Sequence, residues 1–196
     1  MKYQKLVNKE NRLSKNYRPK NLTRIEPKVS GSVDPNRKIW VEKETVESWN
    51  TLVKDAKELG FEFYISSCYR SYVYQEKLLK YYIEKEGIDE ALLHVAIPGT
   101  SEHQTGLAID YFFIRDGQNH FEMLEEDPEY KWLQNNAHKY GFIIRYPKGK
   151  EDITGFRYEP WHLRYVGDIA SYIYENNLTL EEYTSKKEKK LVKQYN

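Results

Sequence analysis

The chain has 196 residues, which is enough for one compact domain and too few for two ordinary ones. Its 31 basic and 30 acidic side chains leave a formal net charge of +1, which argues against general attraction to nucleic acid or to an anionic membrane. Aromatic residues make up 15% of the chain, and these amphipathic rings suit a groove for a sugar or peptide ligand. We therefore expect one domain over residues 1–196, acting as a monomer, that recognises its ligand locally.

Cys68 is the single cysteine, which excludes an intramolecular disulfide and any metal site built from several thiolates. A bound metal must therefore use histidine and carboxylate ligands. The sequence contains no run of about 18 apolar residues, so no integral membrane segment is predicted. The first residues also lack the apolar stretch of a signal peptide. As written, the chain is predicted to be cytoplasmic, with the cell envelope as the alternative if a leader has been removed.

The first half of the chain predicts an irregular arm followed by alternating helices and strands. Residues 1–38 hold few apolar side chains and scattered Pro, Asn and Lys, which is typical of an irregular N-terminal arm. Apolar side chains at three- and four-residue steps predict a helix over residues 44–59, and Gly60 follows as a cap. Residues 61–65 alternate like a half-buried strand, and a second helix is predicted over residues 71–85.

The second half opens with an apolar run, residues 107–113, that has the length of a core strand. Asp110 is the one acid inside that run, so its position requires a specific role. Further along, Asp127 is followed by a proline and an early acid, which is typical of a helix start. This pattern predicts a helix over residues 128–140 with Asp127 as its N-cap.

The last third predicts two more strands and a final helix. Residues 142–146 are predicted as a strand, and residues 157–166 as another that is interrupted near Pro160, because proline lacks an amide donor. A helix over residues 168–175 precedes a Lys-rich tail, residues 184–196, that we expect to be a solvated, fraying end. Strands and helices without a regular βαβ alternation indicate an α+β fold, a small, largely antiparallel sheet with flanking helices.

Two stretches of the chain combine histidine with carboxylates. His103 precedes the predicted strand that contains Asp110, and His162 follows Glu159 by three residues. A catalytic zinc takes three nitrogen or carboxylate ligands and keeps a fourth position open for water. His103, Asp110 and His162 supply that set, and Glu159 is a base that could take a proton from the attacking water. Arg70, at a strand-to-helix turn, could clamp a carboxylate or stabilise an oxyanion.

These residues also have purely structural interpretations. A lone histidine is more often a hydrogen-bonded structural residue than a metal ligand. Glu159 could pair with Arg157 or Arg164, a frequent surface arrangement of small energetic value. The other histidines lack a clustered acid and are interpreted as ordinary residues: His94, His120 and His138. The residue types and their spacing therefore leave the metal site open.

Three motifs follow one another along the chain. Residues 67–71 read Ser-Cys-Tyr-Arg-Ser and are followed by Gln75. Residues 101–110 read Ser-Glu-His-Gln-Thr-Gly-Leu-Ala-Ile-Asp, and residues 159–167 read Glu-Pro-Trp-His-Leu-Arg-Tyr-Val-Gly. In this order they resemble the motifs of the VanY-type D-alanyl-D-alanine carboxypeptidases and their LD-carboxypeptidase relatives. The resemblance covers nearly the whole chain.

The resemblance implies a role for each matched residue. It implies that Zn²⁺ is bound by His103, Asp110 and His162, that Glu159 is the catalytic base, and that Arg70 is the catalytic arginine. Substrate binding is assigned to four further residues: Tyr69, Gln75, Ser101 and Trp161. The fold implied is the small D,D-peptidase fold shared with hedgehog signalling domains.

Two positions depart from the family pattern. Cys68 stands where the family usually has glycine, so the turn that presents Arg70 must tolerate a Cβ atom. A reactive thiol is the less favoured interpretation of Cys68, since nucleophilic cysteines need an electropositive and partly exposed setting. Thr100 replaces a residue that is often aromatic, which affects the expected shape of the substrate pocket.

The function predicted is a zinc-dependent carboxypeptidase that removes terminal D-Ala from peptidoglycan stem or precursor peptides, with the D,D bond favoured. The alternatives are an L,D-carboxypeptidase on tetrapeptide stems, a cytoplasmic D,D-dipeptidase, and a non-catalytic hedgehog-like module that retains zinc. The presence of both Glu159 and Arg70 argues against the module. A serine peptidase using Ser66 or Ser67 is disfavoured, because no lysine stands three residues after either serine.

Overall fold

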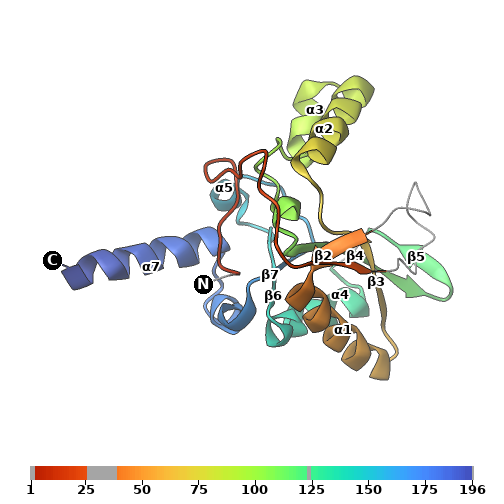
Figure 1. Cartoon of the computed structure of the whole chain (residues 1–196). Helices are drawn as coiled ribbons and strands as arrows, with labels where there is room; N and C mark the ends of the chain where they lie inside the picture. Colours follow the sequence, from red (N-terminus) through yellow and green to blue (C-terminus); the bar gives the residue numbers. More distant parts are fainter. Residues whose placement is uncertain (1–2, 26–38, 123–124, 196) are drawn as a thin grey trace.

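The computed structural model describes residues 3–25, 39–122 and 125–195. Its main sheet has the strand order β3-β4-β7-β6, with β5 paired to one end of β4, and every pairing in it is antiparallel (Figure 1). The fold is therefore α+β with an antiparallel sheet, as predicted. The strands are β3 (Glu62–Ser67), β4 (Ala108–Arg115), β5 (Gln118–His120), β6 (Phe142–Ile144) and β7 (His162–Tyr165).

Helices flank this sheet, and two of them, α2 and α3, pack against each other away from it (Figure 1). The helices are α1 (Lys43–Glu58), α2 (Tyr72–Glu86), α3 (Ile88–His94), α4 (Pro128–Asn136), α5 (Glu151–Thr154), α6 (Ala170–Glu175) and α7 (Leu180–Tyr195). Short 3-10 turns are η1 (Glu102–Thr105), η2 (Ala137–Tyr140) and η3 (Gly167–Ile169). Among the helices of the described ranges, none combines the length and hydropathy that crossing a bilayer requires.

The core is formed where α1 covers the sheet. The Trp49 ring lies 6.3 Å from that of Tyr111 on β4 and 6.4 Å from that of Phe142 on β6, measured between centroids. Leu52 is fully buried beside them, and burying a leucine side chain stabilises a fold by roughly 1.5–3 kcal/mol. This packing fixes β4 within the sheet. Residues near the N-terminal end of β4 are therefore held in defined positions.

The N-terminal arm is not irregular throughout, in contrast to the prediction for residues 1–38. Leu22–Ile25 forms β1, which pairs antiparallel with β2 (Ile39–Glu42), with Thr23 opposite Val41. The pattern of residues 22–25 is too short to predict a strand, and its partner is distant in the sequence. The rest of that prediction, residues 26–38, lies outside the described residues.

The Lys-rich end is also more ordered than expected. Residues 184–195 continue helix α7, which extends away from the sheet (Figure 1). The helix starts with a capping box: Thr179 N–H donates to Glu182 Oε2 at 2.8 Å, and Glu182 N–H donates to Thr179 Oγ1 at 3.1 Å. This Thr-x-x-Glu signal marks the start of the helix that continues through the lysines.

Two further predictions are corrected by tertiary contacts. The strand predicted over residues 157–166 is restricted to β7, because the Glu159 N–H donates to the Tyr146 carbonyl at 3.1 Å and Pro160 has no N–H to continue a ladder. Asp127 precedes α4 but does not cap it through its side chain. Its carboxylate instead accepts a hydrogen bond from Arg115 at 2.8 Å, so it ties α4 to β4.

Candidate active site

The three predicted metal ligands meet at one end of β4 and β7. Asp110 and His162 are opposite each other on these neighbouring strands, and His103 lies on η1, just before β4. One ligand atom from each residue lies within 4.8 Å of the others. In the part of the chain that the structure describes, this is the one such group of three. Antiparallel pairing therefore joins two motifs that are far apart in the sequence.

His103 is held so that one ring nitrogen faces the group. Its Nδ1 lies 2.6 Å from the Cys68 carbonyl oxygen, which can only accept, so Nδ1 carries the proton. Its Nε2 lies 3.1 Å from Asp110 Oδ2. Burial, assisted by the nearby Arg70 charge, lowers the pKa of His103 to about 4. The imidazole is therefore neutral at physiological pH, as a metal ligand must be.

His162 is surrounded by carboxylates on both sides of its ring. Its Nδ1 lies 3.1 Å from Asp110 Oδ1 and 3.8 Å from Glu159 Oε2, and its Nε2 lies 3.6 Å from Glu102 Oε2. Burial acts to lower the pKa of His162, but the nearby carboxylates of Asp110 and Glu102 outweigh burial and raise it to about 9. The metal-free site therefore holds a proton on His162 at neutral pH.

The atoms that face the centre of the group fit a zinc ion. His103 Nε2 and Asp110 Oδ1 are buried and have no hydrogen-bond partner in the structure. Buried polar atoms are costly unless they are paired, and zinc accepts nitrogen and carboxylate oxygen as ligands. Burial acts to raise the pKa of Asp110, yet the two histidines hold it well below its usual value. The donor set is thus two imidazoles and one ionised carboxylate.

Glu159 lies beside this group on the loop before β7. Its side chain is 10% exposed, and Oε2 is 3.8 Å from His162 Nδ1. Burial raises the pKa of Glu159 to about 7, despite the opposing charge of His162. A carboxyl group with a pKa near the ambient pH is suited to accept and return a proton.

Arg70 approaches the group from the end of β3. Its Nη2 is 3.6 Å from Asp110 Oδ2, and its backbone N–H donates to the His103 carbonyl at 3.1 Å. The following residue, Ser71, caps α2 by accepting from the Tyr74 N–H at 3.1 Å, which fixes the turn that presents Arg70. The structure therefore brings Arg70 together with the three candidate ligands.

The structure accommodates both departures from the family pattern, Cys68 and Thr100. Among the described residues, positive φ outside glycine occurs at Asp116 and Asn177, and Cys68 is not one of them, so its Cβ causes no strain. The Cys68 side chain is buried in the hydrophobic core, which gives no support to a reactive thiol. Thr100 is fully buried, and its hydroxyl donates to the Ile97 carbonyl at 2.8 Å. It therefore stabilises the loop before η1 and does not line the surface of a pocket.

The four residues assigned to substrate binding lie close to the motifs but differ in their contacts. Gln75 is buried and donates to the Ala96 carbonyl at 2.8 Å, and Ser101 is buried at the start of η1. Tyr69 is half-buried, and its N–H donates to the Trp40 carbonyl at 2.9 Å. Trp161 packs against the core cluster. Gln75 and Trp161 thus have structural contacts, and substrate contact by any of the four stays a prediction.

Glu102 is a site residue that the sequence interpretation missed. Its Oε1 accepts from Arg145 Nε at 2.8 Å and from Arg164 Nη1 at 2.5 Å, and all three side chains are fully buried. Burial acts to raise the pKa of Glu102, but the two guanidinium groups hold it well below its usual value. Arg164 therefore pairs with Glu102 and not with Glu159. The sequence signal for it is the presence of two arginines in segments predicted as strands. A charge buried in a strand requires a partner of opposite charge, which indicates a buried acid.

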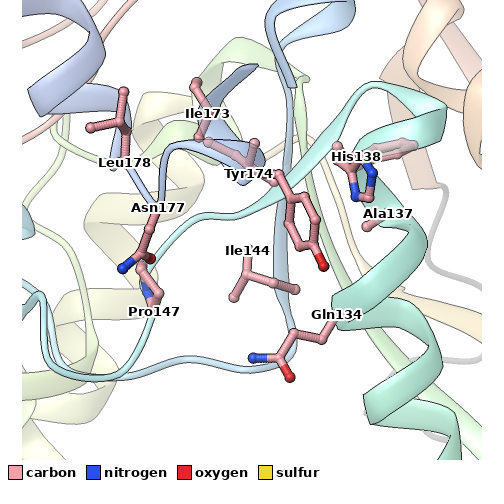
Figure 2. A pocket seen from close by; sticks show the side chains of 11 residues that line it. Gln134, Ala137, His138, Ile144, Pro147, Ile173, Tyr174, Asn177 and Leu178 are labelled. Atoms are coloured by element: carbon pink, nitrogen blue, oxygen red, sulfur yellow. The ribbon is translucent and has the colours of Figure 1, made fainter. Parts of the chain in front are cut away.

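The other described histidines have ordinary partners, as predicted. His94 pairs with Glu86, and the ring of His120 stacks on Phe113 with centroids 4.9 Å apart. His138 stacks on Tyr174 at 3.8 Å, and both line a cavity of about 150 Å³ (Figure 2). None of the predicted site residues lines that cavity, so it is separate from the candidate active site.

Comparison with known proteins assigns the family. Residues 38–168 match VanY, D-alanyl-D-alanine carboxypeptidase. The chain is 46% identical over 189 residues to YodJ of Bacillus subtilis (strain 168), covering 94% of this chain and 67% of YodJ. The solved LdcB LD-carboxypeptidase is 45% identical with a TM-score of 0.79, over 92% of this chain and 84% of that one.

A second solved structure contains a metal. The vancomycin-resistance D,D-pentapeptidase VanY in complex with Zn(II) is 30% identical to this chain with a TM-score of 0.78, over 94% of this chain and 99% of that one. The zinc in this relative and the donor set of this chain both indicate Zn²⁺ as the cofactor. The chain therefore belongs to the VanY D-alanyl-D-alanine carboxypeptidase family, as a metallopeptidase whose candidate zinc ligands are His103, Asp110 and His162.

Proposed function

We propose that this protein is a zinc-dependent carboxypeptidase that releases terminal D-Ala from a peptidoglycan stem or precursor peptide, with the D,D bond as the favoured target. The observation that carries the proposal is the buried group of His103, Asp110 and His162 with an acid and a guanidinium at its edge. Glu159 Oε2 lies 3.8 Å from His162 Nδ1, and Arg70 Nη2 lies 3.6 Å from Asp110 Oδ2. These are the groups that hydrolysis of a peptide bond at a metal requires.

The residues of the chain divide the proton transfers and the charge stabilisation between them. Zinc, when bound, supplies a Lewis acid and lowers the pKa of a bound water toward neutrality. Glu159 takes a proton as water attacks the peptide carbonyl carbon, and it gives that proton to the departing amine nitrogen as the C–N bond breaks. Its pKa of about 7 suits both steps. Arg70 holds the carbonyl oxygen as negative charge develops on it.

The choice of bond is the finer part of the proposal. The family description and the D,D-pentapeptidase relative support a D,D target. An L,D target is the second candidate, since the LdcB LD-carboxypeptidase is 45% identical to this chain. The two substrates differ around the penultimate residue, where a single methyl group alters selectivity by only about 10- to 200-fold. The bond preference is therefore a matter of degree that calls for parallel assays.

The experiment that tests the proposal measures D-alanine released by the zinc-loaded protein from three substrates. These are a stem pentapeptide ending in D-Ala-D-Ala, the corresponding tetrapeptide, and free D-Ala-D-Ala. We expect the fastest release from the pentapeptide. Release from the tetrapeptide alone would replace the D,D assignment with the L,D one. Release from none of the three would contradict the carboxypeptidase proposal itself.

A further inference from the structure

His162 lies beside a group of buried and partly buried charges that the proposed reaction does not use. We call this group the inner charge cluster; its members are Glu102, Arg145, Arg164 and Glu181. Arg145 and Arg164 have 0% exposed side chains, and Glu102 is equally buried. Its Oε1 is occupied by both arginines, which leaves Oε2 facing His162 Nε2 at 3.6 Å. One carboxylate thus connects two guanidinium groups to a candidate metal ligand.

The inner charge cluster extends to the C-terminal helix. Arg145 donates from Nη2 to Glu181 Oε1 at 2.6 Å and from Nη1 to Glu181 Oε2 at 2.9 Å, a two-pronged pair. Glu181 lies in the first turn of α7 and also accepts from Asn8 Nδ2 at 3.2 Å. Helix α7 and Asn8 both lie outside residues 38–168, the part that matches the family.

The cluster also extends to the N-terminal segment. Arg164 Nη2 donates to the carbonyls of Tyr3 at 3.0 Å and Lys5 at 2.7 Å, and its Nε donates to the Tyr165 carbonyl at 3.1 Å. Each arginine is therefore held by partners from more than one segment. A buried ion pair is stable only when its remaining hydrogen-bonding groups are satisfied in this way. These contacts fix the position of the Glu102 side chain.

The position of Glu102 determines which nitrogen of His162 faces the metal. An ionised carboxylate can only accept, so the ring nitrogen facing it must carry the proton. With the proton on Nε2, the lone pair is on Nδ1, which faces Asp110 at 3.1 Å. A hydrogen-bonded carboxylate behind a histidine ligand sets its tautomer and orientation in many metal sites.

We propose that Glu102 is a positioning residue that holds His162 with Nδ1 toward zinc, and that Glu181 and the N-terminal segment support it through the two arginines. The proposal rests on the proposed zinc site. It assigns a role in metal binding to Glu181 and to the N-terminal segment, which contact Arg145 and Arg164. The buried charge of Glu102 orients His162, and the two arginines fix the position of Glu102.

The substitution Glu102→Gln tests this with almost no change of shape. Both arginines require an acceptor at Oε1, so the new amide must present its NH₂ group to His162 Nε2 and favour the wrong tautomer. We expect zinc affinity, measured by competition with a chromophoric chelator, to fall by about 10- to 100-fold. The matched control is Glu129→Gln, which changes another buried carboxylate that pairs with an arginine, Arg115, and contacts no ligand. It should bind zinc as tightly as the wild type.

A second measurement needs no variant and covers the case in which Glu102→Gln does not fold. In ¹⁵N-labelled, zinc-loaded wild-type protein, long-range ¹H–¹⁵N correlation spectra should show the His162 proton on Nε2. Finding it on Nδ1, or finding unchanged zinc affinity in folded Glu102→Gln, would overturn the proposal. Glu181→Gln should weaken zinc binding by less than Glu102→Gln, because it acts through Arg145. Peptide hydrolysis is assayed separately, so unchanged affinity with normal turnover would remove this proposal and leave the carboxypeptidase intact.

Discussion

Two arginine–carboxylate clusters in this protein have similar chemistry and different consequences. The inner charge cluster is shielded from solvent and faces His162. The outer charge cluster, Arg115 with Asp127 and Glu129, ties β4 to the start of α4, and its arginine side chain is 35% exposed. Water can solvate the outer arginine when a partner is lost, but it cannot reach the inner ones. We therefore expect burial, more than the number of ion pairs, to decide what such a cluster contributes to stability.

The largest effect is expected at His162, the candidate ligand that faces the inner charge cluster. His162→Ala removes one of three donors, so we expect loss of bound zinc and of all turnover; His103→Ala should do the same. Metal analysis of the purified variants measures this. Full zinc in both variants would contradict the assignment of the site, and with it the importance of the inner charge cluster for metal binding.

Next in size is the base, which separates metal binding from catalysis. Glu159→Gln keeps the shape of the loop but cannot accept a proton. We expect turnover to fall by about 10²- to 10⁴-fold while zinc content stays normal. Parallel assays of D-alanine release and bound zinc check both parts. Zinc lost together with activity would mean that Glu159, like Glu102, serves the metal and not the reaction.

The comparison between the clusters is tested most directly by matched arginine substitutions. Arg145→Met leaves the fully buried Glu102 and the partly buried Glu181 without one of their cations, so we expect a loss of about 3–5 kcal/mol in the free energy of unfolding. Denaturant titration of zinc-free protein measures it. Equal losses from Arg145→Met and from the corresponding change in the outer charge cluster would refute the role assigned to burial.

The two histidine ligands should also differ in their response to pH. His103 is neutral near pH 7 because its pKa is about 4, whereas His162, with a pKa of about 9 in metal-free protein, is protonated. Zinc must displace that proton, so affinity should rise with pH up to about pH 9, close to tenfold per pH unit. Calorimetry at pH 7 in two buffers of different ionisation enthalpy should detect about one released proton. Release of none would show that His162 is already neutral.

The smallest effect is expected in the outer charge cluster. Arg115→Met removes a cation that is 35% exposed, so water can partly replace it at Asp127 and Glu129, and the free energy of unfolding should fall by less than in Arg145→Met. Zinc affinity should not change. A shift in zinc affinity here would mean that α4 is coupled to the candidate active site by a route that the contacts do not show.

Local patterns predicted much of the architecture and the candidate site. The helix at residues 44–59 and the strand at residues 107–113 both correspond to observed elements, α1 and β4, because their apolar periodicity reflects burial on one face or in the core. The motifs contained His103, Asp110 and His162, which the structure brings together. Asp110 needed a role because an acid inside an apolar strand is costly unless it is paired.

Other features depended on contacts between distant segments. Strand β1 exists because it pairs with β2, and Glu102 is charged in the core because Arg145, directly after β6, and Arg164, on β7, both reach it. In both cases the interaction partners are too distant in the sequence to be found from a short stretch of neighbouring residues. Helix α7 differs, since its capping box is visible in the sequence, but a Lys-rich segment by itself predicts a fraying end.

The sequence by itself determined the kinds of donor available to a metal, the acid beside them and the class of fold, since these follow from residue types and local periodicity. The tertiary structure decided that Asp110 lies opposite His162, which nitrogen of each histidine faces the centre, and that Glu181 and the N-terminal segment contact the inner charge cluster. These depend on strand register and on which buried charges meet. Register and pairing are set by packing across the whole domain, and packing joins residues that no local pattern connects.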